Sequence, residues 1–234
     1  NFFSDKCSTM IWIGNPKYES VQGNYIATDR FFCYKQSAMN WMNKNKLVLA
    51  SRSPRRKELL EQMGLAIDII PPHVDEIGEP GQSPGEFVTI LSEKKARYVM
   101  HQHEDAWVIA ADTIVVKDNQ ILGKPTDREN AIHMIGLLNG RTHSVFTGYT
   151  VAHGNGRQLE THAVETQVRF KTLTKAEILW YTDTDEPYDK AGGYAVQGLG
   201  AFMVKEICGS YTNVVGLPVC EVIQTLKSLK AIQF

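Results

Sequence analysis

The spacing of apolar positions changes repeatedly along the chain, and each change predicts a new element of secondary structure. Apolar runs bounded by turn residues predict strands at 47–50, 67–70, 107–111, 114–116, 142–153, 158–171 and 201–207. Capping residues followed by a helical period predict helices that begin near Ser53, Ser83, Thr126, Thr174 and Pro218. Gly154-Asn155-Gly156 joins the two longest predicted strands and indicates a hairpin. Interleaved strands and helices with one long β-hairpin favour an α/β fold, a mixed twisted sheet with helices on both faces.

The second predicted helix carries two lysines within its apolar arc. Phe87, Leu91 and Tyr98 form the apolar stripe of this helix, and Lys94 and Lys95 fall on either side of its centre. A lysine in such a position either extends along the helix to water or reaches into a functional site. Helical periodicity leaves both outcomes open for both lysines.

Residues 1–41 differ in character from the rest of the chain. They mix aromatic residues, asparagine, lysine and glycine without a sustained strand or helix period. We interpret 1–41 as an N-terminal appendage of unknown role and 42–234 as the functional domain, with Met42 as a natural start. A small extra hairpin packed on the main domain is the alternative interpretation.

The composition is that of a soluble globular protein. Of 234 residues, 43% are hydrophobic and 22% are charged, which disfavours disordered, collagen-like and coiled-coil chains. A net charge of -1 disfavours a nucleic acid polymer as partner, because such binders carry a basic excess, yet it allows a local cationic pocket. No apolar run approaches the roughly 20 residues that a membrane span needs. We therefore expect a cytoplasmic protein without a membrane partner.

The four cysteines lie far apart in the sequence. Cys7, Cys33, Cys208 and Cys220 include no CxxC pair. We expect free thiols in a reducing compartment, rather than a disulfide framework or a zinc site.

The first candidate site is the turn from the first predicted strand into the first helix. It reads Ser51-Arg52-Ser53-Pro54-Arg55-Arg56. Unpaired N–H groups and the positive end of the helix dipole favour an anion at a helix N-terminus, and arginine adds bidentate contacts to phosphate. The segment indicates a phosphate site, with an ordinary capped helix and solvated arginines as the alternative.

Carboxylates form the second group of candidates. Asp112-Thr113 follows the apolar run 107–111, so we expect Asp112 at the end of a buried strand, where ligands gather in α/β sheets. An aspartate there suits proton transfer or metal binding, and a turn-capping role is equally compatible. Asp75-Glu76 either meets a cation such as Mg²⁺ or forms a solvated loop pair.

Two further segments could approach a ligand. Lys124 lies between Gly123 and Pro125, so its restricted backbone either presents it to a phosphate or leaves it in a loop. The glycine-rich segment 191–200 either lets the backbone approach a ligand or forms only a tight connection.

Taken in order, these segments resemble the Maf family of nucleoside triphosphate pyrophosphatases. Each segment is weak alone, whereas the ordered set is specific, and residues 1–41 have no counterpart in it. The matching segments are Ser51-Arg52-Ser53-Pro54-Arg55-Arg56-Lys57-Glu58-Leu59-Leu60, Val74-Asp75-Glu76, Glu93-Lys94-Lys95-Ala96, Ala111-Asp112-Thr113, Gly123-Lys124-Pro125, Arg141-Thr142-His143-Ser144-Val145, Glu186-Pro187-Tyr188-Asp189-Lys190-Ala191-Gly192-Gly193-Tyr194, Gln197-Gly198 and Asn213-Val214-Val215-Gly216-Leu217-Pro218. The resemblance implies an inosine-triphosphatase-like fold.

The resemblance also implies hydrolysis of a nucleoside triphosphate to the monophosphate and pyrophosphate, with a divalent cation, Mg²⁺ or Mn²⁺. Asp112 matches the family's proton acceptor and, with Glu76, is the expected metal ligand. The resemblance selects Lys95 over Lys94. The remaining active-site positions that match are Ser51, Arg56, Glu76, Lys95 and Lys124.

Three positions separate two branches of the family by substrate. Arg55, Thr113 and Gln197 match the branch that acts on dTTP and UTP, rather than the branch that acts on 7-methylguanosine triphosphate. The neutral Gln197 amide both donates and accepts, as a uracil or thymine edge requires, whereas a glutamate would only accept. A 7-methylguanosine triphosphate pyrophosphatase and a nucleotide-binding regulator of septum formation without turnover are the alternatives. Modified pyrimidine nucleotides as substrates and a homodimer stay open.

Overall fold

A mixed sheet of seven strands forms the centre of the structure, a computed structural model that describes residues 45–78 and 81–233. Its strands are β1 (Lys46–Ala50), β2 (Asp68–Ile69), β3 (Ala106–Lys117), β4 (Gln120–Leu122), β5 (Thr142–His153), β6 (Leu159–Phe170) and β7 (Val204–Cys208). The order is β2-β1-β3-β5-β6-β7, and β4 pairs with β3. The pairs β2–β1 and β1–β3 are parallel, and all other pairs are antiparallel. The predicted mixed sheet is confirmed.

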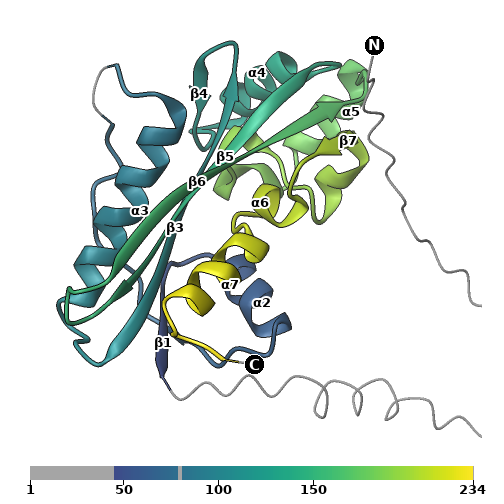
Figure 1. The fold of residues 1–234 in the computed structure, drawn as a ribbon. Coiled ribbons are helices and arrows are strands. Elements are labelled where there is room, and N and C mark those ends of the chain that lie inside the picture. Colours follow the sequence, from purple (N-terminus) through teal and green to yellow (C-terminus); the bar gives the residue numbers. More distant parts are fainter. Residues whose placement is uncertain (1–44, 79–80, 234) are drawn as a thin grey trace, which may run out of the picture. The chain divides into compact units, whose positions relative to one another are not determined.

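Helices cover both faces of this sheet, as predicted (Figure 1). They are α2 (Pro54–Gln62), α3 (Pro84–Met100), α4 (Arg128–Leu138), α5 (Lys175–Thr182), α6 (Tyr211–Val215) and α7 (Val219–Ser228), with short 3₁₀ helices η1 (Glu186–Asp189), η2 (Ala191–Gly193) and η3 (Leu199–Met203). Alternate residues of β3 face opposite layers. Val108 and Ala110 join the core beneath α3, whereas Trp107 and Ile109 join the core shared by α2 and α7.

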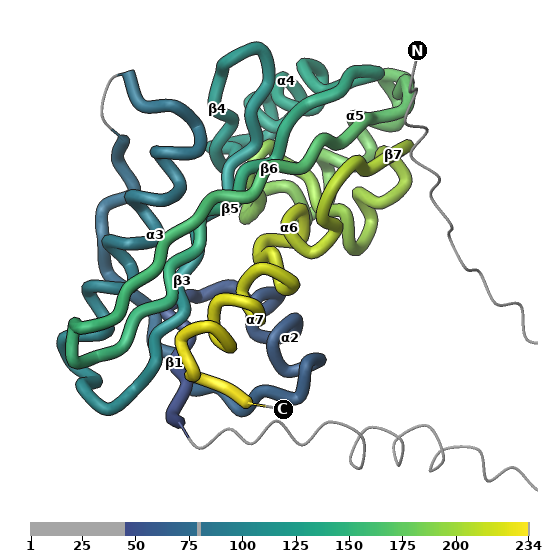
Figure 2. Tube along the Cα trace, in the orientation of Figure 1, coloured from purple at the N-terminus to yellow at the C-terminus, as the bar shows by residue number. Residues whose placement is uncertain are grey.

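The pairing of β3 leaves part of one edge without a neighbouring strand. On that edge, β1 pairs with residues 106–110 and β4 pairs with residues 115–117. Residues 111–114 lie between these two registers. On its other edge β3 pairs with β5 over nearly its full length, and β5 continues into the long β5–β6 hairpin that crosses the molecule (Figure 2).

Helix α3 lies unusually close to β5, because Gly148 has no side chain. A Cβ atom at Gly148 would lie 2.2 Å from the carbonyl oxygen of Val88. The same interface contains a buried hydrogen bond of 2.9 Å between Ser92 Oγ and Thr150 Oγ1. This close contact fixes the height of α3 above the sheet and therefore decides where Lys95, about two turns after Val88, reaches β3.

Local sequence signals account for most helix boundaries. Ser83 and Thr174 each form a capping box, as predicted. The prediction at Thr126 was wrong by one residue: Asp127 caps α4, because its carboxylate accepts the Asn130 N–H at 2.8 Å. Thr126 instead donates its hydroxyl to Asp127.

Two other predictions are corrected by packing. Tyr98 does not belong to the buried stripe of α3; it is 37% exposed, and Val99 is buried instead. The predicted strand 201–207 begins only at Val204, because residues 199–203 form the 3₁₀ helix η3.

Some expectations fall on residues that the structure does not describe. The interpretation of residues 1–41 as an appendage lies outside the described residues, as do Cys7 and Cys33. Cys208 and Cys220 are exposed free thiols. Within residues 45–78 and 81–233, the structure contains no helix with both the length and the apolar character needed to cross a membrane.

Candidate active site

A cavity of ≈ 970 Å³ opens where β1 ends and the edge of β3 lacks a neighbouring strand. Its walls come from the first turn of α2, the loop before α3, the side of α3, the middle of β3, the loop after β4 and the segment around η2. All nine site residues named from the sequence line this one cavity: Ser51, Arg55, Arg56, Glu76, Lys95, Asp112, Thr113, Lys124 and Gln197.

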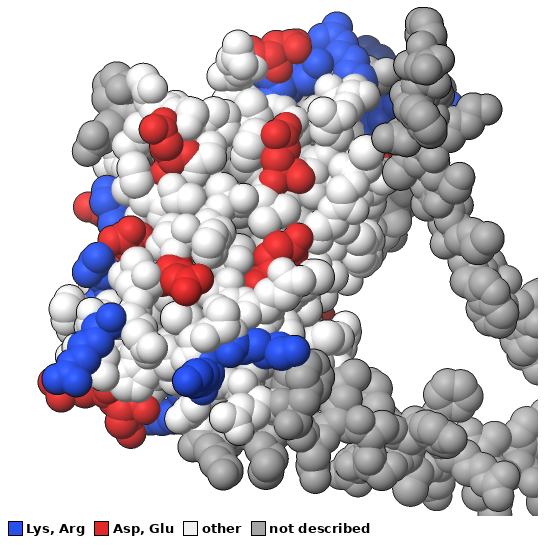
Figure 3. All heavy atoms as spheres, in the orientation of Figure 1, with Lys and Arg blue, Asp and Glu red and all other residues white. Residues whose placement is uncertain are grey.

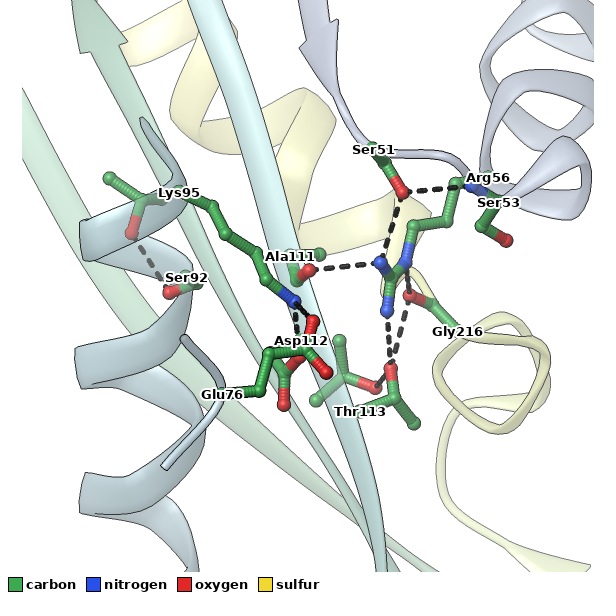
Figure 4. A network of polar contacts seen from close by, with 12 residues as sticks. Ser51, Ser53, Arg56, Glu76, Ser92, Lys95, Ala111, Asp112, Thr113 and Gly216 are labelled. Atoms are coloured by element: carbon green, nitrogen blue, oxygen red, sulfur yellow. Dashed lines mark hydrogen bonds and ion pairs between the residues drawn. The ribbon is translucent and has the colours of Figure 1, made fainter. Parts of the chain in front are cut away.

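Lys95 holds two carboxylates together on the α3 side of β3. Its Nζ lies 2.6 Å from Asp112 Oδ1 and 2.5 Å from Glu76 Oε1 (Figure 4). The side chains of Lys95 and Asp112 are 8% and 11% exposed, whereas that of Glu76 is 55% exposed. Partial burial raises the pKa of Glu76, but the hydrogen bond and charge of Lys95, with the charges of Lys124 and Arg56, outweigh it and lower the pKa overall.

The structure separates the two lysines that helical periodicity left equivalent. Lys95 is buried against the sheet and reaches Asp112, while Lys94 is exposed.

The position of Asp112 corrects a prediction. It lies in the middle of the continuous strand β3 rather than at a strand end. Its side chain reaches a cavity because β1 ends at Ala50, one residue before it would pair with Ala111.

Arg56 organises the opposite side of β3 through neutral acceptors (Figure 4). Its Nε donates to Gly216 O at 2.7 Å, one terminal nitrogen donates to Ser51 Oγ and Ala111 O, and the other donates to Thr113 Oγ1. Four of the five N–H donors of the guanidinium group are thus used. Burial lowers the pKa of Arg56, and the charges of Asp112 and Glu76 act in the other direction.

The charge of Arg56 is not cancelled by a direct ion pair. Among residues 45–78 and 81–233, no carboxylate lies within ion-pair distance of its guanidinium group. A positive charge without a direct ion-pair partner therefore borders the cavity on this side. The first turn of α2, which begins at Ser53 and Pro54, opens onto the same wall and adds the positive end of a helix dipole.

Consecutive residues of β3 bring the two sides together. Asp112 and Thr113 point to opposite faces of the sheet, because side chains alternate along a strand. Asp112 meets Lys95 on the α3 face, and Thr113 meets Arg56 on the α2 face. Both reach one cavity because the edge of β3 is open between residues 111 and 114.

Taken together, the charged residues that line the cavity make it cationic. Six lysine and arginine side chains line it against four aspartates and glutamates, although the whole chain has a net charge of -1. Lys124 and Gln197 are exposed at the rim, and Arg55 is partly buried. On the face drawn in Figure 3, by contrast, acidic and basic side chains are scattered among uncharged ones.

The donor set near Asp112 fits a hard divalent cation that also binds substrate. Mg²⁺ commonly takes one or two protein carboxylates and completes its shell with water and substrate phosphates. Glu76 and Asp112 supply two such carboxylates, held together by one ammonium group. Within the described part of the chain there is no group of three or more His, Cys, Asp or Glu side chains that could hold a metal by itself.

Several lining groups were not identified as site residues from the sequence. Asp189, Lys190 and Tyr194 line the cavity and belong to a segment whose family resemblance was recognised, so their position was a usable signal. The carbonyl groups of Ala111 and Gly216, which orient Arg56, carry no signal of residue type at all.

The chain is similar to proteins with an assigned activity. Residues 46–229 match the family described as Maf-like protein. A protein of Syntrophus aciditrophicus named dTTP/UTP pyrophosphatase is 46% identical over 193 residues, 82% of this chain and 94% of that protein. Proteins of the same name from Syntrophotalea carbinolica and Geobacter sulfurreducens are 48% and 46% identical, over 80% and 82% of this chain and 86% and 100% of their own lengths.

Proposed function

The chain belongs to the Maf family, and on that premise we propose that it hydrolyses dTTP and UTP to the nucleoside monophosphate and pyrophosphate. One observation carries the proposal: a lysine-held carboxylate pair and an arginine without a carboxylate partner border the same cationic cavity. The first supplies a base and the second supplies charge for phosphate. The cavity volume of ≈ 970 Å³ suits a nucleotide.

Asp112 is the proposed proton acceptor for the attacking water. Its Oδ1 accepts the hydrogen bond from Lys95, which leaves Oδ2 to accept the proton of a water molecule in the cavity. The bond to Lys95 also holds the carboxylate in one orientation, with its second oxygen free to act as a base. The water then attacks the α-phosphorus, and pyrophosphate leaves with the electron pair of the broken P–O bond.

The cationic wall is the proposed triphosphate site. Ser51, Arg56 and the first turn of α2 lie on one side, and Lys124 lies at the rim. Positive charge there binds the β- and γ-phosphates and stabilises the charge that develops on the leaving pyrophosphate. Glu76 and Asp112 would hold the divalent cation, which when bound neutralises phosphate charge and polarises the α-phosphoryl group.

Gln197 is the proposed contact to the base, together with Arg55 and Thr113 as the other two specificity positions. Its exposed side chain lies at the rim of the cavity and can match part of the acceptor-donor-acceptor edge of uracil or thymine. Free nucleotides of the cytoplasm are the proposed substrates, because the cationic cavity has the size of a nucleotide.

A substrate panel tests the proposal. Pyrophosphate release would be measured from dTTP, UTP, CTP, ATP, GTP and 7-methylguanosine triphosphate with Mg²⁺ or Mn²⁺, with Asp112→Asn protein as the matched inactive control. We expect dTTP and UTP to give the highest kcat/KM, and EDTA to abolish turnover. A preference for 7-methylguanosine triphosphate would assign the chain to the other branch. Tight nucleotide binding without pyrophosphate release would instead favour a regulator.

A further inference from the structure

Two side chains outside the cavity hold the segment that carries Gln197. The Glu186 carboxylate accepts the Leu199 N–H at 2.9 Å through Oε2 and the Gly200 N–H at 2.7 Å through Oε1. The buried Tyr181 hydroxyl donates to Glu186 Oε1 at 3.0 Å and accepts the Ala195 N–H at 3.3 Å. The backbone is therefore held on both sides of Gln197.

The backbone at Gly198 is shaped around the same carboxylate. Gly198 has φ 96° and ψ −150°, a region that is essentially restricted to glycine. A Cβ atom at Gly198 would lie 2.3 Å from Glu186 Oε2. Gly200 is also tightly packed, since its Cβ would lie 2.9 Å from the Tyr181 hydroxyl and 2.4 Å from the Ala195 carbonyl oxygen. Glycines at 198 and 200 thus allow the chain to wrap tightly around Tyr181 and Glu186.

The proton of Tyr181 keeps this arrangement intact. Burial and the charge of Glu186 raise the pKa of the Tyr181 hydroxyl above its usual value. The hydroxyl therefore stays protonated at neutral pH, donates to Glu186 and uses its oxygen to accept from Ala195.

We propose that Tyr181 and Glu186 are positioning residues that set the selectivity for the pyrimidine base by fixing the backbone on either side of Gln197. This rests on the proposed function, in which Gln197 contacts the base. Gln197 has a long, exposed side chain, and a mobile backbone would add to the entropy lost when the base binds. Hydrogen bonds at residues 195, 199 and 200 remove that backbone freedom before the nucleotide arrives.

Two near-isosteric variants test the proposal. Glu186→Gln replaces one carboxylate oxygen with an NH2 group, which cannot accept a backbone N–H, and Tyr181→Phe removes the hydroxyl but keeps the ring. We expect each to raise KM for UTP about tenfold, the scale of one hydrogen bond to a charged group, with kcat changed less than threefold. The preference for UTP over GTP should fall by a similar factor. The double variant should lose less than the product of the single losses, because both residues act on one segment.

Glu177→Gln is the matched control. Glu177 lies on the same helix as Tyr181, and its carboxylate also accepts a backbone N–H, that of Thr174 at 2.7 Å, but its partners are Lys171 and Thr174 rather than the segment 195–200. We expect this variant to lower the melting temperature and to leave KM and base preference unchanged. Glu186→Gln and Tyr181→Phe proteins that lose melting temperature while keeping normal KM and normal base preference would overturn the proposal.

Amide hydrogen exchange gives a readout that does not depend on turnover. In nucleotide-free protein, the Leu199 and Gly200 amides should exchange faster in Glu186→Gln than in the wild type. Unchanged exchange would show that the hydrogen bonds to Glu186 do not restrain this segment. Absent turnover of UTP and dTTP by the wild type would refute the proposed function, and with it the role in base selection. Faster exchange together with normal selectivity in an active enzyme would refute only the positioning role.

Discussion

Asp112 and Thr113 are neighbours in sequence but lie on opposite sides of β3, and the two sides differ in how the nearby cation is paired. The cation is paired with carboxylates on one side and with neutral acceptors on the other. On the α3 side, the ammonium group of Lys95 is shared between two carboxylates at 2.5 and 2.6 Å, so its charge is cancelled locally. On the α2 side, the guanidinium group of Arg56 is held by carbonyl and hydroxyl groups, so its charge is kept. One side is thereby suited to hold a base and a cation, and the other to attract a polyanion.

Because of this contrast, a cavity with four acidic side chains still has a wall suited to a triphosphate. The carboxylates of Asp112 and Glu76 lie against Lys95, and the opposing wall carries the arginine without a carboxylate partner and the N-terminus of α2. The comparison predicts that changes on the Lys95 side act mainly on kcat and that changes on the Arg56 side act mainly on KM.

Asp112→Asn should have the largest effect. The substitution keeps the shape of the side chain but removes the negative charge and the basic oxygen. We expect kcat to fall by about 10²–10⁴-fold, the usual scale for a positioned general base, while nucleotide affinity is retained. Single-turnover kinetics, nucleotide titration and melting temperature should be measured on the same preparation. Near-normal kcat in folded protein would remove Asp112 from the chemical step.

Lys95→Met should have the next largest effect. It removes the ammonium group that now joins the carboxylates of Glu76 and Asp112. Since Lys95 now lowers the pKa of Glu76, its loss should raise that pKa, and activity that needs ionised carboxylates should be lost at a higher pH as the pH falls. At neutral pH, kcat should drop by about 10²-fold.

The pH profile of kcat checks this prediction against Lys94→Met. Lys94 lies on the same helix but is exposed, and it does not line the cavity. That variant should keep the wild-type profile. If kcat falls at the same acidic pH in Lys95→Met and in the wild type, Lys95 does not control the ionisation of Glu76.

Arg56→Lys tests the other side of the comparison. Lysine keeps the positive charge but cannot reproduce the planar fork that joins Ser51, Thr113 and the carbonyl group of Gly216. We expect kcat/KM to fall by roughly 10–10²-fold, mainly through KM, because several hydrogen bonds that shape the phosphate wall are lost. The exposed Arg97, which pairs with Glu93, provides the control variant Arg97→Lys. A loss confined to kcat would contradict the prediction that changes on the Arg56 side act mainly on KM.

Gln197→Glu should have the smallest effect, because Gln197 lies at the rim and belongs to neither side. A carboxylate would meet the carbonyl groups of uracil, so we expect a loss of about tenfold in kcat/KM for UTP, within the range of one base contact. Hydrolysis rates for UTP and 7-methylguanosine triphosphate measure the change in selectivity. An unchanged ratio in well-folded protein would exclude Gln197 from base recognition.

The sequence by itself determined most of the secondary-structure elements and nominated nine residues that line the cavity. Capping boxes at Ser83 and Thr174 and the Gly154-Asn155-Gly156 hairpin were predictable, because their hydrogen bonds join residues only a few positions apart. The ordered segments also named all nine site residues that line the cavity, and six of these residues are charged. Residue chemistry drew attention to Ser51, Arg56, Asp112 and Lys124, whereas the choice of Lys95 over Lys94 and the specificity positions Arg55, Thr113 and Gln197 came from the family resemblance.

Only the tertiary structure decided which of those residues lie on the α3 side of β3 and which lie on the α2 side. Lys94 and Lys95 were equivalent on the helix until the contact of α3 with Gly148 placed one of them over Asp112. Arg56 is oriented by the carbonyl group of Gly216, 160 positions away, and every residue has such a carbonyl group. The opening beside Asp112 exists because β1 ends one residue short of pairing with Ala111. Such contacts depend on packing between distant elements, and no periodicity or capping signal within one segment carries that information.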